Sequence, residues 1–325
     1  MALRDLSSAG FLDVGQTRVD HKGKRALAFV FDASFLRAFK VLAYTLVATR
    51  SCLDLPVFVF TQDRKVYDDP VVAAVADRRI FITEKDISQF ENISREKVRR
   101  EKQLSWIPKY TFLKWLVFDD HDVDDLLFID ADIVTLSPCD EIFDDAAGTD
   151  MAIAPRFLPS LYSADGARLP PEEVADRYRA LLSADFPADH ININSGVMVL
   201  SGRCLSASFR QQLLKTTEAH ALVNEQSYIT AMLQNETDLS WRMISSKYNF
   251  NAGMLDRVRL HEQIKLLSEI VFLHYPGKIK PWSRPVRNAS SLAHMVWRRC
   301  ETEALEQSEL LGSGKSLRRV LRDWG

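Results

Sequence analysis

Two aspartates, Asp130 and Asp132, stand one residue apart at the end of an apolar run in the middle of the chain. The run, Leu126 to Ile129, has the length and the residue types of a short buried strand. Ligands bind beyond the carboxyl ends of strands in an open α/β sheet, so the two acids follow a strand where a site would form. Neighbouring carboxylates repel each other unless a proton or cation lies between them, and their oxygens suit Mg²⁺ or Mn²⁺. The simplest alternative is a strand end with two solvated acids, because so short a pattern often matches by chance.

A second cluster of residues that could take part in binding or catalysis follows the apolar run 270–273. His274 ends this predicted strand, where a neutral imidazole could complete an oxygen-rich metal site. Gly277 permits close approach of the backbone to a ligand, and Lys278 and Lys280 offer positive charge to a phosphate. Taken alone, the segment could equally be a loop with ordinary lysines.

The elements that must position these residues alternate between strands and helices, which predicts a mixed, mainly parallel α/β sheet flanked by helices. Strands are predicted at 26–31, 57–60, 79–82, 126–129, 151–154, 197–200 and 270–273. Helices are predicted at 35–50, 86–105, 110–118, 207–220 and 225–234. The predicted organisation is a polar lead-in at 1–24, a domain at 25–285 with an insertion at 156–190, and a helical C-terminal extension at 286–325.

Composition is that of a soluble globular protein, with 325 residues, 46% hydrophobic and 26% charged. The net charge of -2 gives no general attraction to nucleic acid or to an anionic membrane. The absence of a signal-peptide pattern and of a membrane-length apolar run predicts a cytoplasmic protein. The cysteines lack close spacing, which favours reduced thiols over a disulfide framework or a zinc site. They are Cys52, Cys139, Cys204 and Cys300.

The two motifs together resemble those of the retaining glycosyltransferases of family 8, which include bacterial lipopolysaccharide galactosyl- and glucosyltransferases and glycogenin. That family has Asp-x-Asp after a strand and, far downstream, His-x-x-Gly-x-x-Lys-Pro-Trp. The five fixed positions of the second motif are occupied here by His274, Gly277, Lys280, Pro281 and Trp282. The resemblance covers about residues 26–282 and implies a Rossmann-like fold of the GT-A type.

The resemblance implies a divalent ion, Mn²⁺ or Mg²⁺, held by Asp130, Asp132 and His274. It implies that Asp32 bonds a uracil base and Phe35 stacks on it, although the family often has a second Asp or a Tyr in this cluster. The full set that it assigns to the nucleotide-sugar donor is Asp32, Ser34, Phe35, Lys114, Asp130, Ala131, Asn194, Ser195, Gly277 and Lys280.

Three residues are implied to act in catalysis. Lys280 would place a fixed positive charge beside the leaving diphosphate. Glu225 and Gln226 stand where the family has Asp-Gln near the sugar, so Glu225 is a departure at a sensitive position. For Asn194 and Gln226, the alternative is a buried amide that satisfies backbone groups. Tyr248-Asn249 also matches a family pair.

The implied activity is metal-dependent transfer of a hexose from a nucleotide sugar, most simply a UDP-sugar, with retention. The acceptor hydroxyl would belong to a glycan, a glycolipid or a glycosylated protein, which places the enzyme in glycan biosynthesis. The bound metal would act as a Lewis acid on the diphosphate. Retention could use a front-face route, in which the leaving phosphate oxygen takes the acceptor proton, or an enzyme nucleophile. We favour the front-face route, with Gln226 or Glu225 stabilising positive charge on the sugar.

Two other functions fit parts of the sequence. Residues 130–134 formally match the nucleophile motif of haloacid-dehalogenase-type phosphohydrolases, but a long α/β pattern precedes them and the downstream Gly-Asp motif is missing. A non-catalytic nucleotide-sugar binding protein is the second alternative. The intact Asp130, Asp132, His274 and Lys280 argue against it.

The last residues form an amphipathic helical pattern. Lys315, Arg318, Arg319 and Arg322 share one face, and Leu317, Val320, Leu321 and Trp324 share another. Apolar stripes at helical spacing usually pack on their own protein, which favours docking onto the domain. Peripheral contact with an anionic membrane is the alternative.

Overall fold

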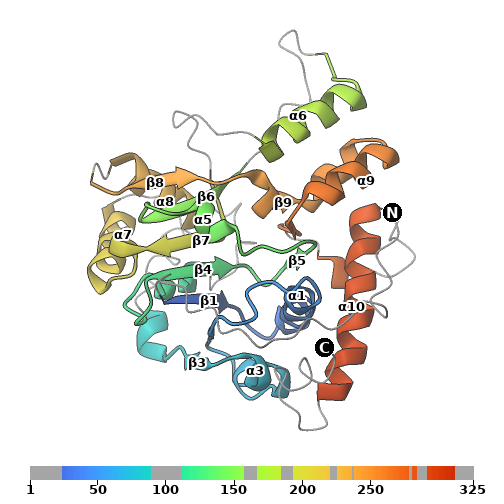
Figure 1. Ribbon diagram of the computed structural model, residues 1–325. Helices are drawn as coiled ribbons and strands as arrows, with labels where there is room; N and C mark the ends of the chain where they lie inside the picture. The colour runs from blue at the N-terminus through green and yellow to red at the C-terminus, as the bar shows by residue number, and fades with distance from the viewer. Residues whose placement is uncertain are drawn as a thin grey trace, which may run out of the picture.

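The computed structural model describes residues 24–88, 111–156, 167–183, 193–219, 225–235, 238–277, 280–283 and 291–311. Within these residues a seven-stranded sheet runs through the centre, in the order β3-β2-β1-β4-β7-β6-β8 (Figure 1). Its strands are β1 (Arg25–Val30), β2 (Val57–Thr61), β3 (Arg78–Phe81), β4 (Asp125–Ile129), β6 (Met151–Pro155), β7 (Ile193–Ser201) and β8 (Trp241–Met243). A smaller sheet has the order β5-β10-β9. Its strands are β5 (Ile133–Thr135), β9 (Phe250–Asn251) and β10 (Phe272–His274).

The large sheet is mixed and mainly parallel. Strand β1 pairs in parallel with β2 and with β4, and β2 pairs in parallel with β3. Strand β7 is antiparallel to both of its neighbours, β4 and β6, while β6 and β8 are parallel. The predicted mixed, mainly parallel α/β sheet is therefore confirmed.

Helices flank the sheet and extend beyond its end. The α-helices are α1 (Leu36–Ala48), α2 (Arg64–Tyr67), α3 (Pro70–Val75), α5 (Ile142–Asp145), α6 (Pro171–Ser183), α7 (Ala207–Ala219), α8 (Glu225–Asn235), α9 (Leu260–Glu269) and α10 (Leu292–Leu311). The 3₁₀ helices are η2 (Thr111–Val117), η3 (Gly202–Cys204), η4 (Ser246–Tyr248), η5 (Ala252–Arg257) and η6 (Pro281–Ser283). The α-helix predicted at 110–118 is thus a 3₁₀ helix.

Side chains alternate between the two faces of the sheet, as strand geometry requires. One face packs against η2, α7 and α8, so that Phe128 of β4 lies in a cluster with Trp115 and Tyr228. The other face packs against α1, α3 and α5, so that Ile129 lies in a cluster with Phe39 and Phe143. Strand β4 is thus buried on both faces. The chain leaves the core only after its carboxyl end, where the half-buried Asp130 follows.

A third cluster joins the small sheet to α1, α6, α9 and α10. Trp297 of α10 is fully buried in it, with its ring centroid 5.0 Å from that of Tyr275 and 5.0 Å from that of Trp282. Helix α10 therefore packs directly behind the segment that carries the second sequence motif.

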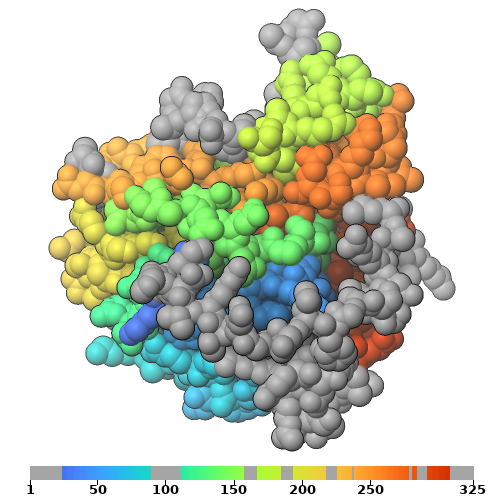
Figure 2. Space-filling view, in the orientation of Figure 1, coloured from blue at the N-terminus to red at the C-terminus, as the bar shows by residue number. Residues whose placement is uncertain are grey.

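Helix α6 projects from the body of the protein beside α9 (Figures 1 and 2). It starts at Pro171, and an ion pair between Arg179 and Glu262 joins it to α9. This helix is the described part of the predicted insertion at 156–190, apart from residues 156 and 167–170.

Three predicted segments lie outside the described residues. They are the lead-in up to residue 23, most of the helix at 86–105, and the amphipathic tail from 312 onwards. Among the residues that are described, no helix combines the length and the apolar character needed to cross a membrane.

Candidate functional site

Three predicted metal ligands converge at the carboxyl end of β4. Asp130 and Asp132 lie in the connection from β4 to β5, and β10 pairs antiparallel with β5 so that His274 stands opposite Ile133. One ligand atom from each of Asp130, Asp132 and His274 lies within 4.8 Å of the others. Asp132 and His274 are buried, whereas Asp130 is half-buried. The fold thus unites two motifs that are far apart in the sequence.

The imidazole of His274 is oriented by an amide. Its Nδ1 lies 2.7 Å from Oδ1 of Asn249, whose Nδ2 donates to Asn194 at the backbone O (3.2 Å) and at Oδ1 (3.1 Å). Since the Asn249 nitrogen is the donor to Asn194, its oxygen must accept, and Nδ1 of His274 must donate. When the imidazole is neutral, Nε2 is left with a lone pair, 3.3 Å from Oδ1 of Asp132. A lone pair and a carboxylate oxygen this close require a proton or a cation between them, so this donor set fits a divalent metal.

A short network of backbone bonds supports the same histidine. Asn194 Oδ1 accepts from Gly196 N at 2.8 Å, and Gly196 O accepts from Asp130 N at 2.7 Å. A Cβ on Gly196 would lie 2.6 Å from Cε1 of His274, so this position admits only glycine without displacing the ring. The side-chain oxygen of Asn194 thus holds both Gly196 and Asn249 in place. The predicted contact of Asn194 with the nucleotide-sugar donor stays a prediction.

On one side of the site, Lys114 joins two carboxylates. Its Nζ lies 2.8 Å from Asp130 and 3.6 Å from Glu225 Oε1, and Ser195 Oγ donates to the same Glu225 oxygen at 3.1 Å. Burial alone would lower the pKa of Lys114, but the charges of Asp130 and Glu225 outweigh it and the pKa is raised. Burial raises the pKa of Glu225, an effect that Asp130 adds to and Lys114 opposes. The position and the charge of Lys114, Glu225 and Ser195 therefore depend on one another.

On the other side, Lys280 pairs with the second aspartate of the motif. Its Nζ donates to Asp132 Oδ2 and, at 3.0 Å, to the carbonyl of Tyr275. Burial alone would raise the pKa of Asp132, but His274 and Lys280 outweigh it and hold that pKa well below its usual range. The sequence assigned Lys280 to a diphosphate rather than to a protein carboxylate, and the structure shows that Asp132 is within its reach.

The predicted base-binding cluster lies at the end of β1. Asp32 Oδ1 accepts from the backbone N of Ser34 at 2.8 Å and from its hydroxyl at 2.5 Å, which closes a tight turn. Phe35 makes an edge contact with Trp282, at 5.7 Å between ring centroids, and Lys280 Nζ lies 5.3 Å from the Phe35 ring. Phe35 is therefore beside the second motif, whereas the bonds recorded for Asp32 stay within its own turn.

The remaining predicted residues fall into two groups. Ala131 is buried between Asp130 and Asp132, and Gly277 has a φ of +96°, which only glycine adopts without strain. Gln226 lies beside Glu225 at the start of α8, and its Oε1 is buried with no hydrogen-bond partner among the described residues. An unsatisfied buried acceptor costs free energy, so Gln226 is a candidate to contact a ligand.

Sequence reasoning missed the role of Asn249 in orienting His274. The Tyr248-Asn249 pair was noted as a motif match without a function. The bond that Ser195 donates to Glu225 was missed as well, because it depends on β7 lying beside α8. Only the general rule that metal-binding imidazoles donate their other nitrogen to an acceptor could have pointed to an amide of this kind.

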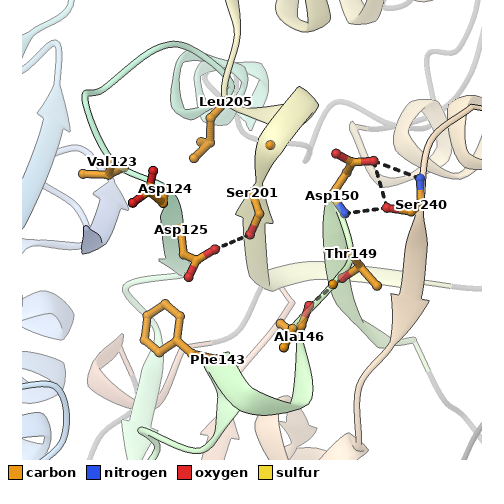
Figure 3. A pocket seen from close by; sticks show the side chains of 13 residues that line it. Val123, Asp124, Asp125, Phe143, Ala146, Thr149, Asp150, Ser201, Leu205 and Ser240 are labelled. Atoms are coloured by element: carbon orange, nitrogen blue, oxygen red, sulfur yellow. Dashed lines mark hydrogen bonds between the residues drawn. The ribbon is translucent and has the colours of Figure 1, made fainter. Parts of the chain in front are cut away.

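A hollow of about 520 Å³ lies at the opposite end of β4, around Asp125 (Figure 3). Its polar groups are already engaged. Asp125 accepts from Ser201 Oγ at 2.7 Å, and Asp150 accepts from Ser240 N at 3.0 Å and Oγ at 2.9 Å. These bonds join neighbouring strands at the end of the sheet opposite Asp130, so the candidate functional site remains the one at Asp130.

The mixed, mainly parallel sheet and the carboxylate and imidazole cluster at the end of β4 agree with the GT-A architecture that the sequence motifs imply. Residues 26–285 match the family model for glycosyl transferase family 8, and the chain belongs to that family. The resemblance noted from the two sequence motifs is therefore confirmed. Among curated proteins, no sequence matches this chain significantly.

Solved structures of glycosyltransferases share the fold. The galactosyltransferase LgtC in complex with donor and acceptor sugar analogues is 14% identical with a TM-score of 0.54, and the match covers 86% of this chain and 95% of that one. The glycosyltransferase GlyE of Streptococcus pneumoniae TIGR4 is 16% identical with a TM-score of 0.53, and the match covers 87% of this chain and 63% of that one. The chain thus spans under two thirds of GlyE, and at these identities the likeness shows the fold alone.

Proposed function

We propose that this protein is a metal-dependent, retaining hexosyltransferase that takes its sugar from a nucleotide sugar, most simply a UDP-sugar. The observation that carries the proposal is the convergence of Asp130, Asp132 and His274, whose ligand atoms lie within 4.8 Å of one another. Lys114 and Lys280 flank this triad and supply the positive charge that a diphosphate requires. The acceptor is a hydroxyl of a glycan, a glycolipid or a glycosylated protein.

Asp130, Asp132 and His274 would hold Mn²⁺ or Mg²⁺, with Asn249 fixing the imidazole so that Nε2 faces the ion. When bound, the ion supplies Lewis-acid stabilisation of the leaving diphosphate. Both lysines are now paired with aspartates of the motif. With those aspartates engaged by the ion, the ammonium groups of Lys114 and Lys280 would bond phosphate oxygens and add fixed positive charge where negative charge develops.

At the sugar, the front-face route requires no enzyme nucleophile. The acceptor oxygen bonds to the anomeric carbon as the bond to the phosphate oxygen breaks, and the acceptor proton passes to that phosphate oxygen. The free Oε1 of Gln226 can stabilise the positive charge on the sugar. Glu225 is tied to Ser195 and Lys114, which supports a positioning role rather than attack on the sugar. Phe35, beside Lys280, supports the proposed stacking on the base, with Asp32 bonding its edge.

The decisive experiment is a panel of nucleotide sugars with Mn²⁺, scored by release of nucleoside diphosphate. We expect turnover with one or more UDP-sugars, its loss on chelation, and its loss in Asp132→Asn. Tight binding of UDP-sugars without release of UDP, across a broad acceptor panel, would instead indicate a binding protein. Membership of glycosyl transferase family 8 already disfavours the phosphohydrolase alternative, and Asp130 follows the fourth strand rather than the first.

A cytoplasmic location is a further part of the proposal, and peripheral membrane contact through residues 315–324 is the alternative to docking of that segment onto the domain. Both come from sequence patterns, and the tail lies outside the described residues. Flotation with anionic liposomes, comparing the full chain with one that ends at Gly312, tests the membrane contact. Equal flotation of the two would overturn it.

A further inference from the structure

Two cysteines that are far apart in the sequence meet on the side of the sheet that carries α1 and α5. Cys52 Sγ and Cys139 Sγ lie 3.6 Å apart, and both side chains are buried. Asp140 accepts from the backbone N of Cys52 at 3.2 Å. One ligand atom from each of the three residues lies within 4.8 Å of the others, and among the described residues only the Asp130 triad is grouped in the same way.

The local backbone is shaped to bring the sulfurs together. Cys52 lies in the turn between α1 and β2 with a φ of +54°, a conformation that costs free energy for any residue but glycine. Asp140 holds this turn through its bond to the Cys52 amide. Cys139 lies in the connection from β5 to α5, on the same stretch of chain that leaves the candidate active site after Asp132. The turn, held by Asp140, keeps the thiol of Cys52 next to that of Cys139.

We propose that Cys52, Cys139 and Asp140 form a binding site for a thiophilic divalent cation of the Zn²⁺ class, separate from the catalytic metal site. Zinc binds thiolates at about 2.3 Å in tetrahedral geometry, which separates two bound sulfurs by about 3.8 Å. The observed distance of 3.6 Å between the two sulfurs is already close to that value. The Asp140 carboxylate supplies the third ligand, and water can supply the fourth. Since Asp140 is exposed, an ion can reach the site from solvent.

Binding of a cation would change the protonation of the two thiols. The hydrogen bond with Cys139, together with burial, raises the pKa of the Cys52 thiol, and the Asp140 charge raises it further. A cation reverses the preference: two sulfur–metal bonds form, two S–H bonds break, and two protons pass to solvent for each ion bound. The nearby Arg25 charge offsets part of the remaining negative charge.

The test is a titration of the reduced full-length protein with Co²⁺, read by the thiolate-to-cobalt charge-transfer absorption in the near ultraviolet. The catalytic triad contains no sulfur, so binding there produces no such band. We expect the band in wild-type protein and its loss in Cys52→Ser and in Cys139→Ser. Asp140→Asn should weaken Co²⁺ affinity by at least about tenfold. The matched control is Cys204→Ser, since Cys204 is equally buried but has no second cysteine beside it, and it should keep the band.

A reduced wild-type protein without the band would overturn the proposal, and so would a band that survives Cys139→Ser. Formation of a Cys52–Cys139 disulfide in air, with no cobalt band after reduction, would replace the metal site by a redox pair. If the serine variants fail to fold, proton release decides the matter in the wild-type protein. Release of two protons for each ion bound at the band-forming site would support the proposal. Release of no protons would contradict it.

Discussion

The imidazole of His274 is constrained from three directions. Asn249 fixes its Nδ1, Asp132 faces its Nε2, and Gly196 leaves only enough room for the ring. Constraint from three directions is what a metal ligand needs, because a ligand already in place loses little conformational entropy on binding. Two predictions test this at the scale of single residues.

The first prediction concerns Asp130, Asp132 and His274, the proposed metal ligands. Asp130→Asn, Asp132→Asn and His274→Ala should each lower metal-dependent transfer by about 10²-fold or more, because each removes charge stabilisation of the leaving diphosphate. Steady-state kinetics over a range of Mn²⁺ concentrations measures the loss, with circular dichroism as the check on folding. Asp150→Asn is the control, since that carboxylate lies at the opposite edge of the sheet. Normal turnover of a well-folded Asp132→Asn in chelator would refute the metal site.

The second prediction concerns Gly196. In Gly196→Ala the new Cβ would lie 2.6 Å from Cε1 of His274, so the ring must move. We expect weaker Mn²⁺ binding by calorimetry and a stability loss of about 1–3 kcal/mol. The control is Gly253→Ala, where the nearest atom to the new Cβ is 3.3 Å away and φ is ordinary. Wild-type Mn²⁺ affinity in Gly196→Ala would show that His274 does not bind the metal.

At the scale of elements, the sequence predicts the long strands and the site that follows them, because runs such as 126–129 and 197–200 are unambiguous. Strands β5, β8 and β9 were missed, since two or three residues carry no periodic pattern. The antiparallel direction of β7 also escapes sequence reasoning, because a strand that is buried on both faces looks the same in either direction.

The segment 110–118 was predicted as a helix and forms the 3₁₀ helix η2. Phe112 and Trp115, three residues apart, both face the core, and this spacing suits a 3₁₀ helix as well as an α-helix. The donor-side Lys114 was predicted from the resemblance to the family. Its bridge from Asp130 to Glu225 could not be predicted, because it depends on where α8 packs.

The third prediction belongs to the connection between η2 and β4. His121 is buried against Phe58 and Phe60, and its Nε2 lies 3.2 Å from the carbonyl of Val117. Burial lowers the pKa of His121, and Asp119 opposes this only in part. His121 therefore binds a proton more readily in the unfolded chain than in the folded protein. The contribution of neutral, buried His121 to folding stability is complete above the unfolded pKa of about 6.5 and is lost as pH falls below it.

Urea unfolding at a series of pH values tests this effect. Wild-type protein should lose stability between pH of about 7.5 and about 5.5, and His121→Gln should lose less over the same interval. His261→Gln is the control, because that imidazole is exposed at the surface. An identical pH dependence in wild type and His121→Gln would contradict the assignment.

At the scale of the whole molecule, the site exists because distant parts of the chain are held together. Lys280 and Asp132 are 148 positions apart in the sequence, yet they form an ion pair. The segment that carries Lys280 is supported from behind by α10, which follows the family motif in the sequence. The C-terminal helix therefore contributes to the geometry of the site without supplying a ligand to it.

The fourth prediction tests this support. Trp297 is fully buried, its ring packs against Tyr275 and Trp282, and its Nε1 donates to Glu301 at 3.3 Å. Trp297→Ala should cost about 3–5 kcal/mol of unfolding free energy, because it removes the largest side chain of this cluster. Turnover should fall as well, since the backbone around Lys280 loses its packing partner.

Urea unfolding and steady-state kinetics measure both effects, and Trp297→Phe should recover part of each by restoring an aromatic ring. Met295→Ala on the same helix is the control, because Met295 is 51% exposed, and its effect on stability should stay within about 0.5 kcal/mol. If α10 only shielded the core, Trp297→Ala would unfold more easily but would keep wild-type kcat under conditions where it is fully folded. A lower kcat in folded protein, with recovery in Trp297→Phe, is the result expected if packing by α10 holds Lys280 at the diphosphate.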